Sequence, residues 1–168
     1  MWYNVKMRRN STLTFIITAA GIAAVYAVCT LLQAFSAFGS VQFRVAEALT
    51  VLPFYSPAAI AGLTLGCAIA NGIASPMPLD IIIGTLASLI AALLTRVIRI
   101  KWLAPLPPVL VNAVFMGAML TFYETGGFPL SLLAFHMGSI AFWQALVCYG
   151  LGLPLLVFLE RTVFKNKD

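Results

Sequence analysis

Residues 42–74 read QFRVAEALTVLPFYSPAAIAGLTLGCAIANGIA, an apolar stretch that two prolines, Pro53 and Pro57, interrupt. Its only charges, Arg44 and Glu47, lie near its start. A membrane-spanning helix needs about 20 predominantly apolar residues, and proline ends or kinks a helix. The stretch therefore predicts either one kinked helix or two shorter helices.

The composition of the whole chain is that of an integral membrane protein. Of its 168 residues, 62% are hydrophobic and 9% charged, and the mean hydropathy is +1.01. Soluble domains are about half apolar and about one quarter charged. These values exclude a soluble cytosolic enzyme, a disordered chain and a secreted disulfide scaffold. Cys29, Cys67 and Cys148 lie in apolar runs without a CxxC motif, which predicts buried thiols.

The charges divide the chain into uncharged runs, and the basic residues indicate how these runs cross the membrane. Lysine and arginine concentrate on the cytoplasmic side of membrane proteins. If residues 42–74 form two helices, nine of the ten basic residues lie inside with both termini, and only Arg44 lies outside. The sequence thus predicts a single all-α domain, residues 1–168, whose six transmembrane helices are at about 13–35, 41–55, 57–74, 79–97, 104–122 and 140–159. The inside clusters are Lys6, Arg8 and Arg9; Arg96, Arg99 and Lys101; and Arg161, Lys165 and Lys167.

This topology places Glu47, Asp80 and Glu124 in the outer half. Ionisable groups near a membrane interior are costly and indicate function or pairing. An outward-facing acidic cavity suits a small ligand that is cationic or rich in N–H donors. The sequence has no phosphate-binding loop, no Ser–His–Asp pattern and only one histidine, so we expect no enzyme activity, catalytic residue, metal or cofactor.

The first apolar run carries small residues at helical spacing. Ala19, Ala23 and Ala27 recur every four residues, with Ala20 and Ala24 beside them. Small residues at this spacing allow close approach of another helix. They fit either a surface that docks a partner protein or packing within the same bundle.

Several segments together resemble a known family. They are QFRVAEALTVLP at 42–53, FYSPAAI at 54–60, LDIIIGTLA at 79–87 and WLAPLPPVLVNA at 102–113. Over about residues 12–160 the chain resembles the QueT family, the queuosine-precursor substrate-binding (S) components of energy-coupling factor (ECF) transporters. The block at 42–53 is the most specific part.

The resemblance implies a function and partners. S components are six-helix proteins of the prokaryotic plasma membrane that bind a vitamin-like solute on the extracellular side. They dock through an alanine-rich first helix onto a transmembrane coupling subunit carried by two ATPases, which hydrolyse the ATP. The implied ligand is 7-aminomethyl-7-deazaguanine. It has a guanine-like edge with adjacent N–H donors, a carbonyl, a flat π face and an ammonium.

Such a ligand fits residue types in the outer half of this chain. A carboxylate can accept two parallel N–H bonds, a second acid can hold the ammonium, and amides and aromatic rings can complete the site. Glu47 is the first choice for the edge, with an ion pair to Arg44 as its alternative role. The candidate substrate-binding residues are Glu47, Asn71, Asp80, Asn112, Tyr123, Glu124, Trp143 and Gln144.

Most of the other candidates also have a structural alternative, which for Asn71 and Asn112 is a hydrogen bond to a neighbouring helix. Asp80 follows a proline-rich turn, and its expected main role is to cap a helix. Glu124 is either a solvated loop acid or a partner for the ammonium, and Trp143 is an interfacial anchor or a stacking ring. His136 lies in a segment, residues 128–139, that could close over the site, and it is expected to be a surface-loop histidine.

Two other functions stay open at this point. One is an S component for another small heterocyclic vitamin, and the other is a membrane scaffold without transport activity. A scaffold predicts no saturable ligand and tolerance of a neutral residue at position 47. A binding protein predicts the opposite.

Overall fold

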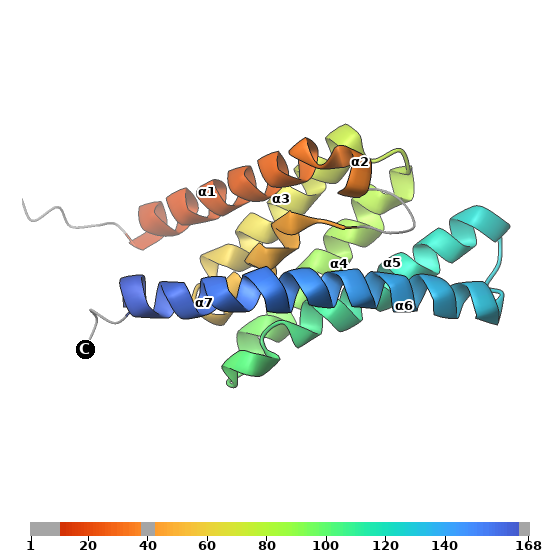
Figure 1. Cartoon of the computed structure of the whole chain (residues 1–168). Coiled ribbons are helices and arrows are strands. Elements are labelled where there is room, and N and C mark those ends of the chain that lie inside the picture. The colour runs from red at the N-terminus through yellow and green to blue at the C-terminus, as the bar shows by residue number, and fades with distance from the viewer. Residues whose placement is uncertain (1–10, 38–42, 165–168) are drawn as a thin grey trace, which may run out of the picture.

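The computed structural model describes residues 11–37 and 43–164, and within these ranges all regular secondary structure is helical (Figure 1). The expected basic residues Lys6, Arg8, Arg9, Lys165 and Lys167, and the start of the helix expected at 41–55, lie outside the described residues. The main helices are α1 (Ser11–Leu32), α2 (Ala34–Ala37), α3 (Ala58–Ala74), α4 (Pro78–Val97), α5 (Leu106–Thr125), α6 (Leu130–Val147) and α7 (Leu153–Leu159). Between and after them lie the 3₁₀ helices η1 (Val45–Phe54) and η2 (Lys101–Leu103) and the π-helical turns η3 (Cys148–Gly152) and η4 (Glu160–Phe164).

Four stretches are long and apolar enough to cross a membrane: Ser11–Leu32, Pro78–Val97, Lys101–Thr125 and Leu130–Thr162. The protein is therefore a multi-pass membrane protein. Two further apolar helices, η1 and α3, are shorter than these four. Their contribution to a total of six crossings stays a prediction.

Residues 42–74 fold, where described, as two helices and not as one kinked helix. The first, η1, is a ten-residue 3₁₀ helix that contains Pro53. Tyr55 and Ser56 separate it from α3, which starts directly after Pro57. Runs of 3₁₀ helix longer than three or four residues are uncommon.

The connection between α4 and α5 lies at the same end of the bundle as the end of the last helix (Figure 1). Lys101 Nζ lies 2.6 Å from Glu160 Oε2, and Arg96 Nη1 donates a 2.9 Å hydrogen bond to the carbonyl of Phe54. The middle basic cluster thus lies beside the C-terminal helix end, as the grouping of basic residues predicts. Which side of the membrane this end faces stays a prediction.

The segment at residues 128–139, expected from its turn residues to be a loop or cap before the last span, is instead mostly helical. Gly126 adopts φ +68°, a left-handed conformation that ends α5, and α6 begins at Leu130. The turn residues form only a short connection between two antiparallel helices, because glycine adopts this left-handed conformation without strain. His136 is consequently not a surface-loop residue. It lies within α6 and is only 1% exposed.

Glycines of α3 allow a close contact with α1. A Cβ atom built on Gly66 would lie 2.8 Å from the carbonyl oxygen of Ala23 and 2.9 Å from Cβ of Tyr26. A Cβ atom built on Gly62 would likewise lie 2.7 Å from the carbonyl oxygen of Ala19. Backbones can approach this closely only where a side chain is missing. The contact fixes α1 against the rest of the bundle.

We expect Gly66→Ala to lower the free energy of unfolding by about 1–3 kcal/mol, because the added methyl group must push α1 away from α3. Thermal unfolding of the purified protein in detergent measures this. The matched control is Gly72→Ala in the same helix, where an added Cβ meets nothing within 4 Å. Equal melting temperatures for the two variants would contradict the close contact.

Candidate functional site

The first feature of the site is a buried carboxylate that three helices contact. Glu47 lies in the first turn of η1 and is 2% exposed. Its Oε1 accepts a 2.6 Å hydrogen bond from the hydroxyl of Tyr26 on α1. Its Oε2 accepts bonds from Gln144 Nε2 on α6, at 2.9 Å, and from Asn112 Nδ2 on α5, at 3.4 Å. Every one of these side chains presents a donor, so Glu47 acts as an acceptor through both oxygens.

Arg44, one turn before Glu47, forms a second buried cluster. Its Nη2 lies 3.3 Å from Oδ2 of Asp80, and both side chains are at most 6% exposed. Its Nη1 donates to Oδ1 of Asn71 at 3.4 Å, and its Nε donates to the carbonyl of Ala37 at 2.7 Å. The ion pair of Arg44 is therefore made with Asp80 on α4, and not with Glu47 as the alternative role of Glu47 requires.

Asp80 lies in the first turn of α4, as expected for an acid that the helix dipole stabilises, but its side chain makes no capping hydrogen bond to the described residues. Residue Met77 is the N-cap of α4, and no side-chain hydrogen bond caps this end. The carboxylate of Asp80 instead accepts a 2.8 Å bond from the hydroxyl of Ser75 and pairs with Arg44 through the same oxygen, Oδ2. Its Oδ1 is buried and accepts no hydrogen bond from the described residues.

A glycine allows this cluster to assemble. A Cβ atom on Gly84 would lie 2.6 Å from Nδ2 of Asn71 and 2.8 Å from Oδ1 of Asp80. Asn71 Nδ2 also donates to the backbone carbonyl of Asp80 at 2.9 Å, which ties α3 to α4. Only a residue without a side chain fits at this point, because any larger one would displace the two polar groups.

Glu47 and Arg44 line the same small cavity. Its other lining residues are Gly84, Ser88, Asn112, Met116 and Gln144, and it encloses about 10 Å³. A volume of about 10–15 Å³ is what one water molecule requires. In this conformation the polar side chains are therefore bonded to one another and fill the space. A ligand with the size of a purine would have to separate them.

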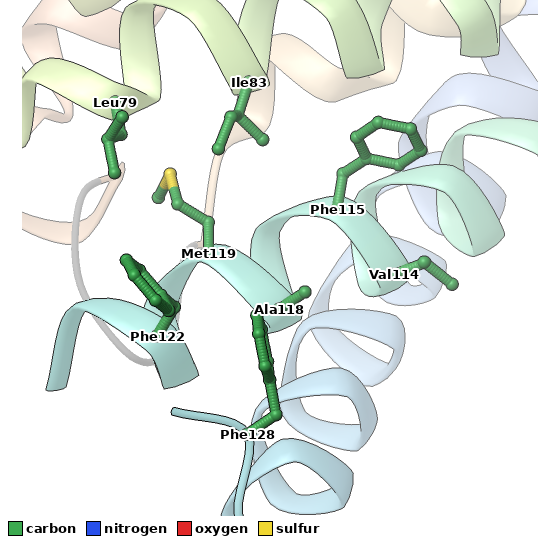
Figure 2. Close-up of a pocket in the computed structure, with 8 residues that line it drawn as sticks. All are labelled: Leu79, Ile83, Val114, Phe115, Ala118, Met119, Phe122 and Phe128. Carbon is green, nitrogen blue, oxygen red and sulfur yellow. The ribbon is translucent and has the colours of Figure 1, made fainter. Parts of the chain in front are cut away.

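A much larger cavity has the opposite character. Figure 2 shows the residues of a groove between α4 and α5. The volume of this groove is about 550 Å³. Its lining is apolar throughout: Leu79, Ile83, Val114, Phe115, Ala118, Met119, Phe122 and Phe128. This surface offers neither donors nor acceptors, so the smaller polar cavity is the better candidate for a ligand that is rich in N–H groups.

The structure does not bring every predicted residue to this cavity. Glu124, at the end of α5, is 45% exposed, and its Oε1 lies 3.5 Å from Nε2 of the buried His136. Tyr123 is 56% exposed. Trp143 precedes Gln144 on α6, but its ring packs edge-on against that of Phe43 at a centroid distance of 5.7 Å. None of these three lines the polar cavity, and their ligand roles stay predictions.

Sequence reasoning missed Tyr26 as part of the site. It is fully buried, although α1 otherwise consists mainly of small and aliphatic residues and much of its surface is exposed. The available signal was a hydroxyl-bearing ring in the middle of an uncharged helix, since a buried tyrosine hydroxyl normally has a partner.

The alanines of α1 divide between two faces. Ala19, Ala23 and Ala27 are each 6% exposed and face the bundle interior, where Ala19 and Ala23 contact the α3 glycines. Ala20 and Ala24 are exposed. The first group therefore serves packing within the bundle, and only the second offers small residues to another protein.

Comparison with known proteins yields one family. The sequence model described as QueT transporter matches residues 16–161. A curated relative, "Queuosine precursor transporter QueT" of Lactococcus lactis subsp. cremoris, is 35% identical over 86 residues. This alignment spans half of the present chain and half the length of the relative. No solved structure matches the chain significantly.

Proposed function

The chain belongs to the QueT transporter family, and on that premise we propose that it is the substrate-binding (S) subunit of an ECF-type importer. Its substrate is a queuosine precursor, 7-aminomethyl-7-deazaguanine, captured on the extracellular side. A transmembrane coupling subunit and two ATPase subunits supply the energy for uptake. In this proposal the chain makes six crossings, with both termini in the cytoplasm.

The observation that carries this proposal is the buried acceptor cluster around Glu47. The guanine-like edge of the substrate presents adjacent N–H donors, and a carboxylate accepts such bonds more strongly than a neutral group does. Asn112 and Gln144 each donate through their amide nitrogen to Glu47, and no described residue donates to their amide oxygens. Oε2 of Glu47 and these two oxygens form a set of acceptors at one cavity.

The second cluster supplies a site for the aminomethyl group. Oδ1 of Asp80 is buried without a partner among the described residues, and it lies beside Gly84, which lines the cavity. Buried polar atoms are normally hydrogen-bonded, so an unused acceptor oxygen favours a donor group of the ligand at this place. The pairing of Asp80 with Arg44 holds that oxygen in position.

The small cavity requires that binding and opening occur together. Gln144 closes one wall through its 2.9 Å bond to Glu47, and the π-helical turn η3 begins four residues later. Such turns often occur at functional sites, because they interrupt the regular hydrogen-bond ladder. In this proposal α6 moves away from η1 to admit the substrate.

The exposed side of α1 is the proposed docking surface for the coupling subunit. Ala20 and Ala24 lie one turn apart and leave space for a close helix contact within the bilayer. Ala19, Ala23 and Ala27 contribute by holding α1 against α3.

Calorimetric titration of the detergent-purified protein, without partner subunits, tests the function. We expect one-to-one binding of the aminomethyl precursor, with an affinity at least about tenfold higher than for the nitrile analogue, which lacks the ammonium. Guanine serves as a second control. A folded sample that does not bind the precursor would overturn the queuosine assignment. Binding of a different heterocycle by that sample would keep the role as an S component.

A further inference from the structure

Tyr26 makes the shortest contact to the carboxylate of the candidate site. Its hydroxyl lies 2.6 Å from Oε1 of Glu47, a distance typical of a hydrogen bond to an ionised oxygen. The two residues are 21 positions apart in sequence, and both are almost completely buried. The bond therefore joins α1 to η1 in a region without competing solvent.

The ring of Tyr26 has little freedom to move. It packs in a buried cluster with Leu63, Cys67 and Ala92. Its Cβ lies at the point where Gly66 lacks a side chain, so the backbone of α3 supports it directly. A hydroxyl held on a fixed ring defines the position of the oxygen that it contacts.

The two oxygens of Glu47 differ in their surroundings. Oε2 contacts Asn112 and Gln144, which both line the polar cavity. Oε1 contacts Tyr26, which does not line it. Tyr26 thus bonds the carboxylate on the side away from the cavity and leaves Oε2 on the cavity side.

We propose that Tyr26 is a positioning residue that reserves Oε1 of Glu47 and presents Oε2 alone to the ligand. This inference rests on the proposed function. It assigns recognition of the guanine-like edge to more than one side chain. The two adjacent N–H donors of that edge then go to Oε2 and to an amide oxygen of Gln144 or Asn112. The arrangement replaces the two-oxygen contact with Glu47 that the sequence predicts.

Such an arrangement selects for a ligand that carries both donors. If Tyr26 loses its hydroxyl, the carboxylate can rotate and no longer holds Oε2 in register with the amide oxygens. A ligand with the complete edge then loses affinity. An analogue that lacks the exocyclic amino group has only one of the two edge contacts to lose.

The test is Tyr26→Phe, which removes one oxygen atom and keeps the ring. Titration calorimetry measures the aminomethyl precursor and its analogue without the exocyclic amino group. We expect the precursor to bind about tenfold more weakly to the variant, with a change of less than about threefold for the analogue. The matched control is Tyr55→Phe, which makes the same change at a tyrosine that does not line the polar cavity and should leave both affinities unchanged.

Further measurements separate positioning from structural effects. Ligand-free melting curves identify loss of folding. In a Glu47→Gln background, Tyr26→Phe should change the dissociation constant of the precursor by less than about twofold, because the carboxylate that Tyr26 positions is already absent. Equal weakening of both ligands, or an unchanged affinity for the precursor, would overturn the role of Tyr26. Failure of the wild-type protein to bind the precursor would instead overturn the proposed function on which this role rests.

Discussion

Glu47→Gln is expected to weaken binding of the aminomethyl precursor by about a hundredfold, which corresponds to about 2.7 kcal/mol. The glutamine amide offers one acceptor oxygen, whereas the carboxylate offers two. Tyr26 already occupies one of these with its hydroxyl at 2.6 Å. In the variant, the Tyr26 hydroxyl can accept a hydrogen bond from the amide NH₂, but the ligand then meets a neutral amide oxygen in place of a charged carboxylate oxygen, and hydrogen bonds to ionised groups are about twice as strong. Titration calorimetry on the detergent-purified protein measures the loss.

Glu124→Gln is the matched control for this substitution. It makes the same chemical change in an acid that is 45% exposed and lies beside His136, away from the polar cavity. We expect its affinity for the precursor to equal that of the wild-type protein. A large loss in Glu124→Gln together with full affinity in Glu47→Gln would move the edge contact out of the η1 cluster. Both variants should show cooperative unfolding, which excludes misfolding as the cause.

The sequence was sufficient to identify the class of fold, because the bilayer imposes a simple requirement. Every backbone polar group within it must be bonded internally, so long uncharged runs become helices. The apolar runs correspond to α1, α4 and α5, whose ends lie within a few residues of the expected positions. The two prolines left one kinked helix or two shorter helices open, and the distribution of the basic residues favoured two, which the separation of η1 from α3 agrees with.

The sequence could not predict which polar groups meet. Arg44 and Glu47 are close along the chain, and their spacing suggests an ion pair, yet Arg44 pairs with Asp80, 36 residues away. Glu47 instead meets Gln144, 97 residues away. Such contacts depend on how helices rotate and approach one another, and in this protein glycines such as Gly84 permit them. A list of polar residues contains no information about that packing.

The error at residues 125–139 has a related cause. Thr125, Gly126 and Gly127 are turn residues, and the sequence alone does not show how many further residues belong to the connection. The apolar residues from Leu130 onward fit a capping loop or a helix equally well. Packing of α6 along α5 favours the helix, and it buries His136 beside Thr121, with 3.0 Å between Nδ1 and Oγ1.

Arg44→Met is expected to lower the free energy of unfolding by about 3–5 kcal/mol, because it leaves the buried carboxylate of Asp80 without its ion-pair partner. The guanidinium also bonds Asn71 and the carbonyl of Ala37, so one substitution disconnects η1 from three neighbouring segments. Reversible unfolding in mixed micelles measures the change. The methionine side chain fills a similar volume, which limits the effect to the lost polar contacts.

Two further variants show whether the buried charge is the cause. Arg44→Met combined with Asp80→Asn removes both charges and should recover at least half of the lost stability, because no uncompensated ion is then left inside the bundle. Lys101→Met breaks the exposed pair with Glu160 and should leave the unfolding transition unchanged, since water solvates the remaining acid. A double variant less stable than Arg44→Met would contradict this explanation. The contacts of Arg44 with Asn71 and Ala37 would then be the main source of stability at this site, and the charge of Asp80 a secondary one.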